Sequence, residues 1–226
     1  MVSDEVMDWE NAYREEGGFG GPPPWNIGEP QPELAALIEQ GKIRSDILDA
    51  GCGHAELSLA LAGRGYTVVG IDVAPTAVAA ASAAADKRGL TTATFVVDDI
   101  TSFSGYDDRF NTIVDSTLFH SLPVDAREPY LRAVHRAAAQ GAALYMLVFT
   151  VGAFPPEFEF KPHELTESEL RDAVSKHWEV DEIRPAFIHA NPIEIPDAPF
   201  PMPRHDADDK GRLKFPALLL TAHKAG

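Results

Sequence analysis

The 226-residue sequence lacks several features that define large classes of protein. Its one cysteine, Cys52, excludes an intrachain disulfide and a cysteine-rich zinc site, and we expect it to fill tight space rather than act as a nucleophile. No apolar run approaches the roughly 18 residues of a membrane-spanning helix. The first residues are acidic and contain no apolar core of a signal peptide. We therefore expect a cytoplasmic protein with no membrane partner.

Basic residues are also scarce. The 19 lysines and arginines face 35 aspartates and glutamates, which gives a formal net charge of −16 at pH 7. Such a surface repels phosphate backbones, so we expect no nucleic-acid partner and a small-molecule substrate instead. The length fits a single α/β domain over residues 1–226, as a monomer or a weak dimer.

The chain is organised around residues 46–56, where a short apolar strand is followed by a glycine turn and the start of a helix. Glycines let the backbone turn tightly and approach a ligand, and the helix start offers unpaired N–H groups. A dinucleotide-binding fingerprint would place a small residue at position 56, where this chain has Glu56. A second layout, acid-x-Gly-x-Gly-x-small, is met in full by Asp49, Gly51, Gly53 and Ala55.

Acidic residues also end the strands that follow. We expect strands at 67–72, 92–97 and 110–116, alternating with helices, and then further strands at 143–149, 178–184 and 215–223. This alternation predicts an α/β fold with a doubly wound, mostly parallel sheet. The carboxyl ends of its strands meet at one edge, so Asp72 is placed to accept hydrogen bonds from the two hydroxyls of a ribose.

The glycine turn resembles the first motif of class I S-adenosylmethionine (SAM) methyltransferases, with Ala55 in place of the usual third glycine. Residues 24–32, PWNIGEPQP, are similar to the "PWDxGxPxP" segment of the thiopurine and halide/thiol methyltransferase group, with Asn26 where that pattern often has aspartate. The resemblance implies SAM as cofactor, S-adenosylhomocysteine as product and no metal. It also implies a Rossmann-like seven-stranded sheet in the order 3-2-1-4-5-7-6 with an antiparallel last strand.

The resemblance also implies a set of cofactor-binding residues. Asp99 takes the position that accepts from the adenine amine, although the adjacent Asp98 could share or take that role. The strand-four end is expected to hang over the ligand. The full expected set is Trp25, Asp49, Gly51, Gly53, Asp72, Val73, Asp98, Asp99, Ile100, Asp115 and Ser116.

Three irregular segments, 1–32, 151–165 and 185–216, are rich in proline and two of them in aromatic residues. We expect them to act as lids that bound a dry acceptor pocket, because aromatic faces attract a sulfonium and stack on planar rings. An alternative is that Trp9 and Trp25 simply pack against the domain. The acidic run at 206–209 is interpreted as a solvated loop. The expected acceptor-binding residues are Trp9, Tyr13, Phe19, Phe119, His120, Phe154 and Phe158.

Two histidines are candidates for a general base. His120 follows the fourth strand, and His163 lies in the second lid segment. Histidine suits proton transfer near neutral pH. The alternative for His120 is a hydrogen bond or packing contact beside the acceptor, and an acceptor that is already a thiolate or phenolate would need no base.

These patterns predict methyl transfer from SAM to oxygen, nitrogen or sulfur of a small aromatic or heterocyclic acceptor. Within the group, the chain looks most like the mycobacterial heterocyclic toxin methyltransferases, which implies hydroxyquinolone-type acceptors and a detoxifying role. A thiopurine or halide/thiol S-methyltransferase is the nearest alternative. A nicotinamide-dependent (NAD) oxidoreductase and a non-catalytic SAM-binding module are more distant ones.

Overall fold

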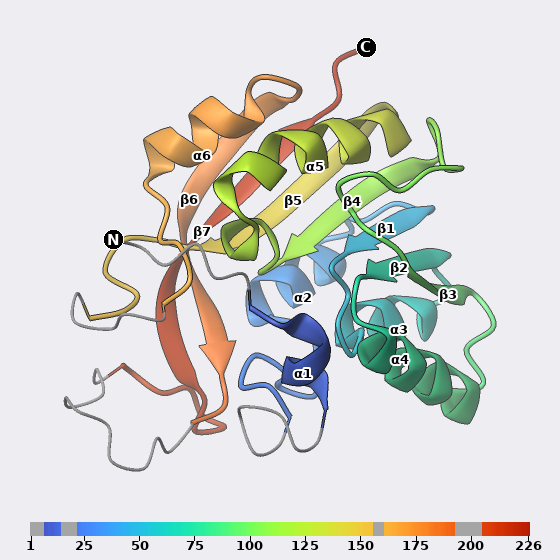
Figure 1. Cartoon of the computed structure of the whole chain (residues 1–226), viewed down its shortest axis with the longest axis horizontal. Coiled ribbons are helices and arrows are strands. Elements are labelled where there is room, and N and C mark those ends of the chain that lie inside the picture. Colours follow the sequence, from blue (N-terminus) through green and yellow to red (C-terminus); the bar gives the residue numbers. More distant parts are fainter. Residues whose placement is uncertain (1–6, 15–21, 156–160, 193–204) are drawn as a thin grey trace.

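A seven-stranded sheet in the order β3-β2-β1-β4-β5-β7-β6 forms the centre of the molecule (Figure 1). The computed structural model describes residues 7–14, 22–155, 161–192 and 205–226. The first five strands run parallel, and β7 is antiparallel to both of its neighbours, as the sequence predicts. The strands are β1 (Ile47–Ala50), β2 (Val68–Asp72), β3 (Ala93–Val97), β4 (Phe110–Ser116), β5 (Ala138–Phe149), β6 (Glu179–Ala190) and β7 (Leu213–His223).

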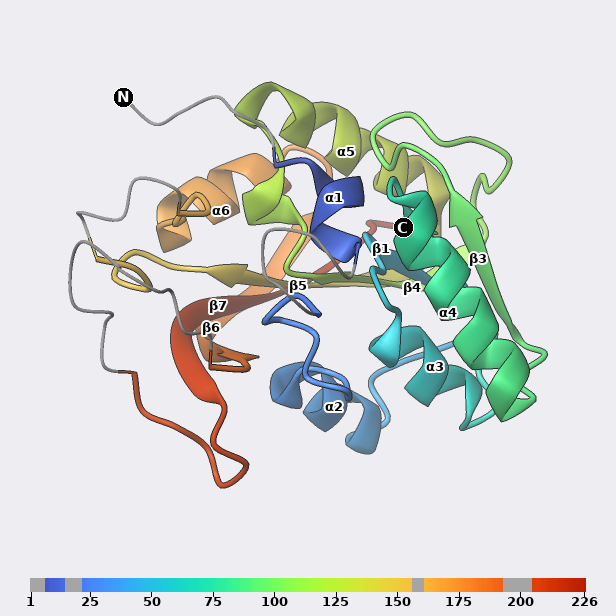
Figure 2. The same ribbon diagram turned by 60° about the horizontal axis from the view of Figure 1, so that its bottom comes forward.

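Helices cover both faces of this sheet. Three lie on one face, α2 (Pro32–Glu39), α3 (Glu56–Ala62) and α4 (Pro75–Arg88), and two on the other, α5 (Val124–Ala137) and α6 (Glu167–Val174) (Figure 2). The short α1 (Trp9–Tyr13) lies against α4, and a 3₁₀ helix, η1 (Phe119–Ser121), follows β4. Local sequence sets several helix ends. Proline opens α2 and α4, and a capping box between Thr166 and Glu169 opens α6.

The core fixes where the strands end. Every residue of β1 and β2 is buried, and their helices pack on them through leucine, isoleucine and alanine side chains. In the sheet register, Ala50 pairs with both Ile71 and Asp115. The carboxyl ends of β1, β2 and β4 therefore lie side by side, and the loops that follow them share one edge of the sheet.

Two boundaries differ from the prediction. The strand expected at 178–184 continues as β6 to Ala190, and β7 begins at Leu213, so both ends of the expected lid at 185–216 belong to paired β-strands. Pro185 suggested irregular chain, but β6 is an edge strand, where a missing N–H costs no ladder hydrogen bond. In addition, α5 ends at Ala137 and β5 begins at once, earlier than expected. Among the described residues, no helix is long and apolar enough to cross a membrane.

Candidate active site

The glycine turn after β1 is shaped by close contacts that leave no room for side chains. Gly51 and Gly53 have positive φ angles of 67° and 53°. A Cβ on Gly51 would lie 2.9 Å from Cδ1 of Leu118, and one on Gly53 would lie 2.6 Å from the hydroxyl oxygen of Tyr13. Ala55, in place of the third glycine, also adopts a left-handed conformation, at φ 60°. This conformation costs a residue with a Cβ roughly 1–2 kcal/mol, so alanine differs from glycine here in more than size.

Two buried carboxylates hold this turn. Asp72 accepts hydrogen bonds from the backbone N–H groups of Gly53 (2.8 Å) and Ala74 (2.9 Å), and burial raises its pKa. Asp49 accepts from the Ser58 hydroxyl at 2.6 Å, and burial raises its pKa to about 6 despite that hydrogen bond. Both side chains line a cavity of about 1380 Å³ that opens at this edge of the sheet.

Asp115 and Ser116, at the end of β4, were both expected to bind the cofactor, but their surroundings differ. Ser116 lines the cavity, whereas Asp115 is fully buried outside its lining. Asp115 accepts from the N–H groups of Leu118 (2.9 Å) and Phe119 (3.2 Å) and from the Tyr130 hydroxyl (2.8 Å). The described contacts of Asp115 are thus structural: this carboxylate braces the loop that carries Leu118 against the glycine turn.

Phe119, expected among the acceptor-binding residues, lies in the core and not at the main cavity. Its side chain is fully buried in the core beside Tyr130, with ring centroids 6.1 Å apart, and it lies outside the lining of the main cavity. Phe154 stacks on Phe149 and Phe215, at 4.9 and 5.4 Å, and Phe149 rather than Phe154 faces the cavity. The other two phenylalanines of the expected acceptor set, Phe19 and Phe158, lie outside the described residues.

The adjacent aspartates after β3 separate clearly. Asp99 lines the cavity together with Val73 and Ile100, and Val73 is 56% exposed. Asp98 is outside the lining and accepts a hydrogen bond from the Asp99 N–H at 2.8 Å. The geometry thus places Asp99, and not Asp98, at the cavity.

Three aromatic side chains cover the glycine turn from the N-terminal segment. Trp25 makes edge contacts with both Trp9 (6.0 Å) and Tyr13 (6.5 Å), and Tyr13 packs perpendicular to the His54 ring at 5.0 Å. Below them, Asn26 Nδ2 lies 2.9 Å from Nδ1 of His54. All five side chains line the cavity, so these tryptophans are part of a cover over the site in addition to packing on one another.

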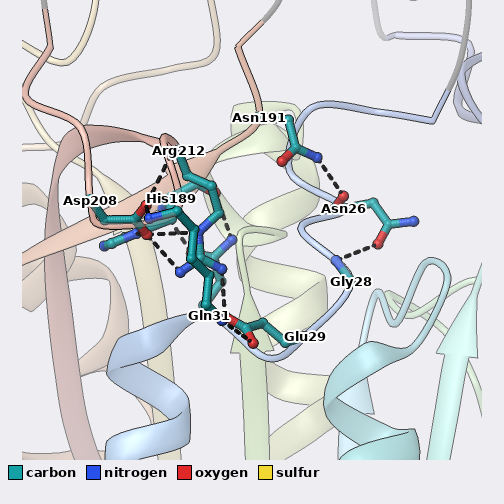
Figure 3. A network of polar contacts seen from close by, with 9 residues as sticks. Asn26, Gly28, Glu29, Gln31, His189, Asn191, Asp208 and Arg212 are labelled. Carbon is teal, nitrogen blue, oxygen red and sulfur yellow. Dashed lines mark hydrogen bonds and ion pairs between the residues drawn. The ribbon is translucent and has the colours of Figure 1, made fainter.

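The cover is attached at both ends. In α1, Glu10 accepts hydrogen bonds from the backbone N–H and the hydroxyl of Thr76, which begins α4, at 3.0 and 2.5 Å. After the tryptophan segment, the Gln31 side chain exchanges hydrogen bonds with the backbone of His189, at 2.8 and 2.9 Å, and Asn191 donates to the Asn26 carbonyl (Figure 3). The first lid segment is thereby fixed to α4 on one side and to β6 on the other.

An ion-pair network extends this attachment to the β6–β7 hairpin (Figure 3). Arg212, with a side chain only 9% exposed, contacts Glu29 at 2.5 Å and Asp208 at 2.6 Å. His189 Nδ1 lies 2.9 Å from the same Asp208 carboxylate, and Lys210 binds Glu29 from the solvent side. The solvated-loop interpretation of residues 206–209 is therefore wrong for Asp208, which serves as the shared acceptor of the network.

The opposite end of the cavity has a cationic and aromatic lining. His120, His163, Arg127, Lys161 and Phe149 contribute to it. The His120 ring is 3% exposed and stacks beside the Phe149 ring at 4.5 Å. Burial, followed by the nearby charges of Arg127 and His163, lowers the pKa of His120 to about 3. His163 is also lowered in pKa, first by burial and then by Arg127.

Sequence reasoning gave no site role to Arg127 or His54. A signal for Arg127 was present, because it lies in line with Tyr130, Leu131 and Val134 on the buried stripe of α5. A charged residue in such a stripe is rarely buried without a partner. His54 stands inside the glycine motif, but its role depends on Asn26, which is 28 residues away.

Comparison with known proteins agrees with this geometry. Residues 47–141 match the family described as "Methyltransferase domain". The chain is 55% identical over 193 residues to the 2-heptyl-1-hydroxyquinolin-4(1H)-one methyltransferase of Mycobacteroides abscessus, covering 84% of this chain and 85% of that one. A probable thiol methyltransferase 2 of Arabidopsis thaliana is 26% identical over 157 residues, covering 67% of this chain and 65% of the relative.

Solved structures share the fold. One, described as "Conversion of a Disulfide Bond into a Thioacetal Group during Echinomycin Biosynthesis", superposes with a TM-score of 0.81 at 32% identity, over 97% of this chain and 92% of that one. A Burkholderia thailandensis 1,6-didemethyltoxoflavin-N1-methyltransferase, with its substrate and S-adenosylhomocysteine bound, shares the fold with a TM-score of 0.62 at 21% identity, over 86% and 77% of the two chains. The glycine turn, the sheet order and these relatives together show that the chain belongs to the class I SAM-dependent methyltransferases.

Proposed function

We propose that this enzyme transfers the methyl group of SAM to a hydroxyl oxygen on a small heterocycle of the hydroxyquinolone type. The observation that carries the proposal is the 55% identity to a hydroxyquinolone methyltransferase over 85% of that protein. The cavity supports it by size. Pockets for one small ligand measure roughly 300–1,000 Å³, and about 1380 Å³ leaves room for a cofactor and an acceptor together.

The acidic end of the cavity fits the cofactor. Gly51 and Gly53 bring bare backbone to the cavity wall, where side chains would collide. We assign Asp72 to the ribose hydroxyls and Asp99 to the adenine amine, with Val73 and Ile100 on the faces of the base. Each of these side chains lines the cavity, and carboxylates are the acceptors that hydroxyl and amine donors require. Among the described residues, no cluster of histidine, cysteine, aspartate and glutamate is arranged to hold a metal ion.

The aromatic cover and the cationic end fit the acceptor. Trp9, Tyr13 and Trp25 present ring edges and faces on one side, and Phe149 lies on the other. A planar heterocycle between such rings is held mainly by stacking and burial. The attachment of the cover to α4 and β6 holds these rings over the cavity.

When bound, SAM supplies an electrophilic methyl group: a lone pair of the acceptor oxygen forms the new O–C bond while the C–S bond breaks and leaves its electron pair on sulfur. The chain has to orient the acceptor and exclude water. His120 would act as a hydrogen-bond donor to the acceptor through Nε2, because Nδ1 already accepts from the Phe149 N–H at 3.2 Å.

The proposal is tested by incubating the protein with methyl-labelled SAM and, in parallel, 2-heptyl-1-hydroxyquinolin-4(1H)-one, a thiophenol and 6-mercaptopurine. We expect label on the quinolone oxygen at a kcat/KM at least tenfold above that for either sulfur acceptor. Preferential labelling of sulfur would favour thiol or thiopurine methylation. Cofactor binding without any labelled product would favour a non-catalytic SAM-binding module.

The cofactor assignment is tested by a matched pair of neighbours. Asp99→Ala should weaken SAM binding about tenfold, since a hydrogen bond from a charged group contributes about 1.5–3 kcal/mol. Asp98→Ala removes the same charge one residue away and should change the calorimetric Kd by less than about twofold, because Asp98 is outside the cavity lining. Equal effects of the two variants would contradict the assignment.

A further inference from the structure

Arg127 is a buried cation without an evident structural purpose. It belongs to the apolar face of α5, in line with Tyr130 and Leu131, and only 8% of its surface is exposed. Taking a guanidinium out of water is costly unless its donors are satisfied. Each N–H donor of Arg127 therefore needs an acceptor.

Part of the guanidinium is held in place. Nε donates to the Leu122 carbonyl at 3.3 Å, and the central carbon lies 5.2 Å from the centre of the Phe119 ring. These contacts fix its plane. Nη2, however, is buried and has no hydrogen-bond partner within the described part of the chain. This nitrogen has almost no accessible surface, so it is an unsatisfied donor inside the wall rather than a group exposed in the cavity.

No carboxylate of the described residues forms an ion pair with Arg127. Glu169 is the acid that acts on its charge, but the Glu169 carboxylate accepts from the N–H and hydroxyl of Thr166, at 2.8 and 2.7 Å, in the cap of α6. Lys161, another cation of the cavity wall, is already paired with Glu164 at 2.6 Å. Arg127 therefore differs from Lys161 in having no ion-pair partner among the described residues.

This unpaired cation belongs to the acceptor end of the cavity. Arg127 lines the main cavity together with His120 and His163, and it also borders an adjoining cavity of about 370 Å³ between α5 and α6. The carboxylates assigned to the cofactor, Asp72 and Asp99, belong to strand ends elsewhere on the wall. A negatively charged group beside Arg127 would meet a cation and a neutral imidazole donor, and no competing acid from the cofactor set.

We propose that Arg127 selects the ionised form of the acceptor, an oxyanion on an aromatic heterocycle that has lost its proton to solvent before it binds. This inference rests on the proposed function and adds the charge state of the substrate. The guanidinium supplies the donor that the oxyanion or its conjugated carbonyl oxygen needs, and charge-assisted hydrogen bonds of this kind are the stronger ones. A proton-accepting residue then becomes unnecessary.

The groups that face Arg127 limit other sources of pH dependence. The titratable and charged side chains that share a cavity lining with Arg127 at this end are His120 on η1, Lys161 and His163 in the segment before α6, Asp125 and Glu128 on α5, and Glu169, Asp172 and Lys176 on α6. Both histidines have lowered pKa values, in part because of Arg127 itself, which favours their neutral forms. Binding should accordingly follow the ionisation of the acceptor.

The test compares two probes by calorimetry with S-adenosylhomocysteine present. 2-Heptyl-1-hydroxyquinolin-4(1H)-one has the acidic hydroxyl, and 2-heptylquinolin-4(1H)-one lacks it. Arg127→Met should weaken the first probe about 10- to 100-fold, the range expected for a hydrogen bond to a charged group, and leave the second within about twofold. Arg127→Lys should give an intermediate loss. Arg132→Met, an exposed arginine of the same helix, should change neither.

Two further readouts separate recognition from a structural role. The wild-type affinity for the hydroxylated probe should rise with pH through the probe's own pKa and then level off, and Arg127→Met should lose that rise. The thermal midpoint of Arg127→Met should be equal to or above that of the wild type, since removing an unpaired buried charge relieves a desolvation cost. Equal weakening of both probes, or no weakening of either, would overturn the inference. Failure of the wild type itself to bind and methylate the hydroxylated probe would instead refute the proposed function, before any variant is made.

Discussion

The Nδ1 atom of His120 lies 3.2 Å from the backbone nitrogen of Phe149, whose N–H donates to it. A backbone N–H can only donate, so Nδ1 accepts and the neutral imidazole holds its proton on Nε2. A second proton would have to enter at Nδ1, against that N–H. Burial and the charge of Arg127 act in the same direction and lower the pKa of His120 to about 3. The imidazole is therefore arranged as a donor, and the general-base role expected from sequence has no geometric support.

We predict that the pH profile of kcat shows no ionisation that belongs to His120 between pH 5 and 9. His120→Ala should lower kcat about tenfold, the size of one lost hydrogen bond, with little change in the Kd of SAM. His223→Ala, at an exposed histidine of β7, is the control and should have no effect. An acidic limb near pH 6.5 that vanishes in His120→Ala would show that the residue is a base after all.

The lowered pKa of His120 also makes the stability of the folded protein depend on pH. Between about pH 6.5 and pH 3 the unfolded chain binds a proton at His120 and the folded chain does not, so the folded state loses free energy of unfolding as the pH falls through this window. His120→Asn keeps an acceptor for the Phe149 N–H and cannot titrate. Its urea midpoint should therefore fall less steeply between pH 6.5 and 4 than that of the wild type.

Asp115 should make the free energy of unfolding depend on pH in the opposite direction. Burial raises its pKa to about 7 even though it accepts three hydrogen bonds. Between about pH 4 and 7 the folded chain binds the extra proton, so its contribution to stability is present at low pH and is lost as the pH rises through 7. Asp115→Asn removes this titration, and the stability difference between variant and wild type should shift in favour of the variant from pH 4 to 7.

Urea unfolding at several pH values measures this shift. Asp86→Asn, on the exposed face of α4, controls for the loss of a carboxylate and should run parallel to the wild type. A difference between Asp115→Asn and wild type that is constant with pH would mean that Asp115 is charged throughout, held so by Tyr130 and the two N–H groups.

The contrast between Asp115 and Asp72 shows what the sequence can predict. Both acids lie at the carboxyl end of a buried strand, and the strands, the glycine turn and several helix starts follow from local patterns of apolar residues, glycine and proline, whereas the sheet order was implied by the family resemblance. Which acid faces the cavity depends on more distant residues. Asp72 binds the turn 19 residues before it, whereas Asp115 is drawn inward by Tyr130 on the following helix. The sequence pattern of β4 does not show that the hydroxyl of Tyr130 on α5 will bind Asp115.

The ion-pair network around Arg212 depends even less on local sequence patterns. Glu29 and Arg212 are 183 residues apart and meet only because β6 and β7 form a long hairpin beside the tryptophan segment. Pro185 and the acidic run suggested irregular, solvated chain there. The structure differs for two tertiary reasons. An edge strand tolerates proline, and Arg212 is buried between two acids.

We predict that Arg212 stabilises the cover over the site and that Lys210 contributes little. Both bind Glu29, but the Arg212 side chain is 9% exposed and that of Lys210 is 61% exposed. Arg212→Met leaves Asp208 and Glu29 without their buried partner and should cost about 2–4 kcal/mol. Lys210→Met should cost less than about 1 kcal/mol. Urea unfolding measures the stability of each variant, and the KM for the acceptor reports on the cover. Equal effects of Arg212→Met and Lys210→Met would contradict the prediction that the buried arginine anchors the cover.

The last prediction concerns Asn26, which stands where the related motif often has aspartate. Asn26 Nδ2 donates to Nδ1 of His54, so His54 is neutral, and burial lowers its pKa. In Asn26→Asp a carboxylate would face that nitrogen, Nδ1 would have to be protonated, and the pKa of His54 should rise. A histidine whose pKa is raised on folding stabilises the protein below its unfolded pKa, and this contribution is lost as the pH rises through the folded value.

Asn26→Asp should therefore gain stability at pH 5.5 relative to pH 8.5 when each is compared with wild type, by about 0.5–1 kcal/mol for a partly exposed pair. NMR titration of the His54 ring should show the upward shift directly. His54→Gln in the Asn26→Asp background removes the titrating group, so the double variant should lose the pH-dependent gain. If the gain persists without His54, it comes from elsewhere in the cover, and the contact between the tryptophan segment and the glycine turn does not couple Asn26 to His54.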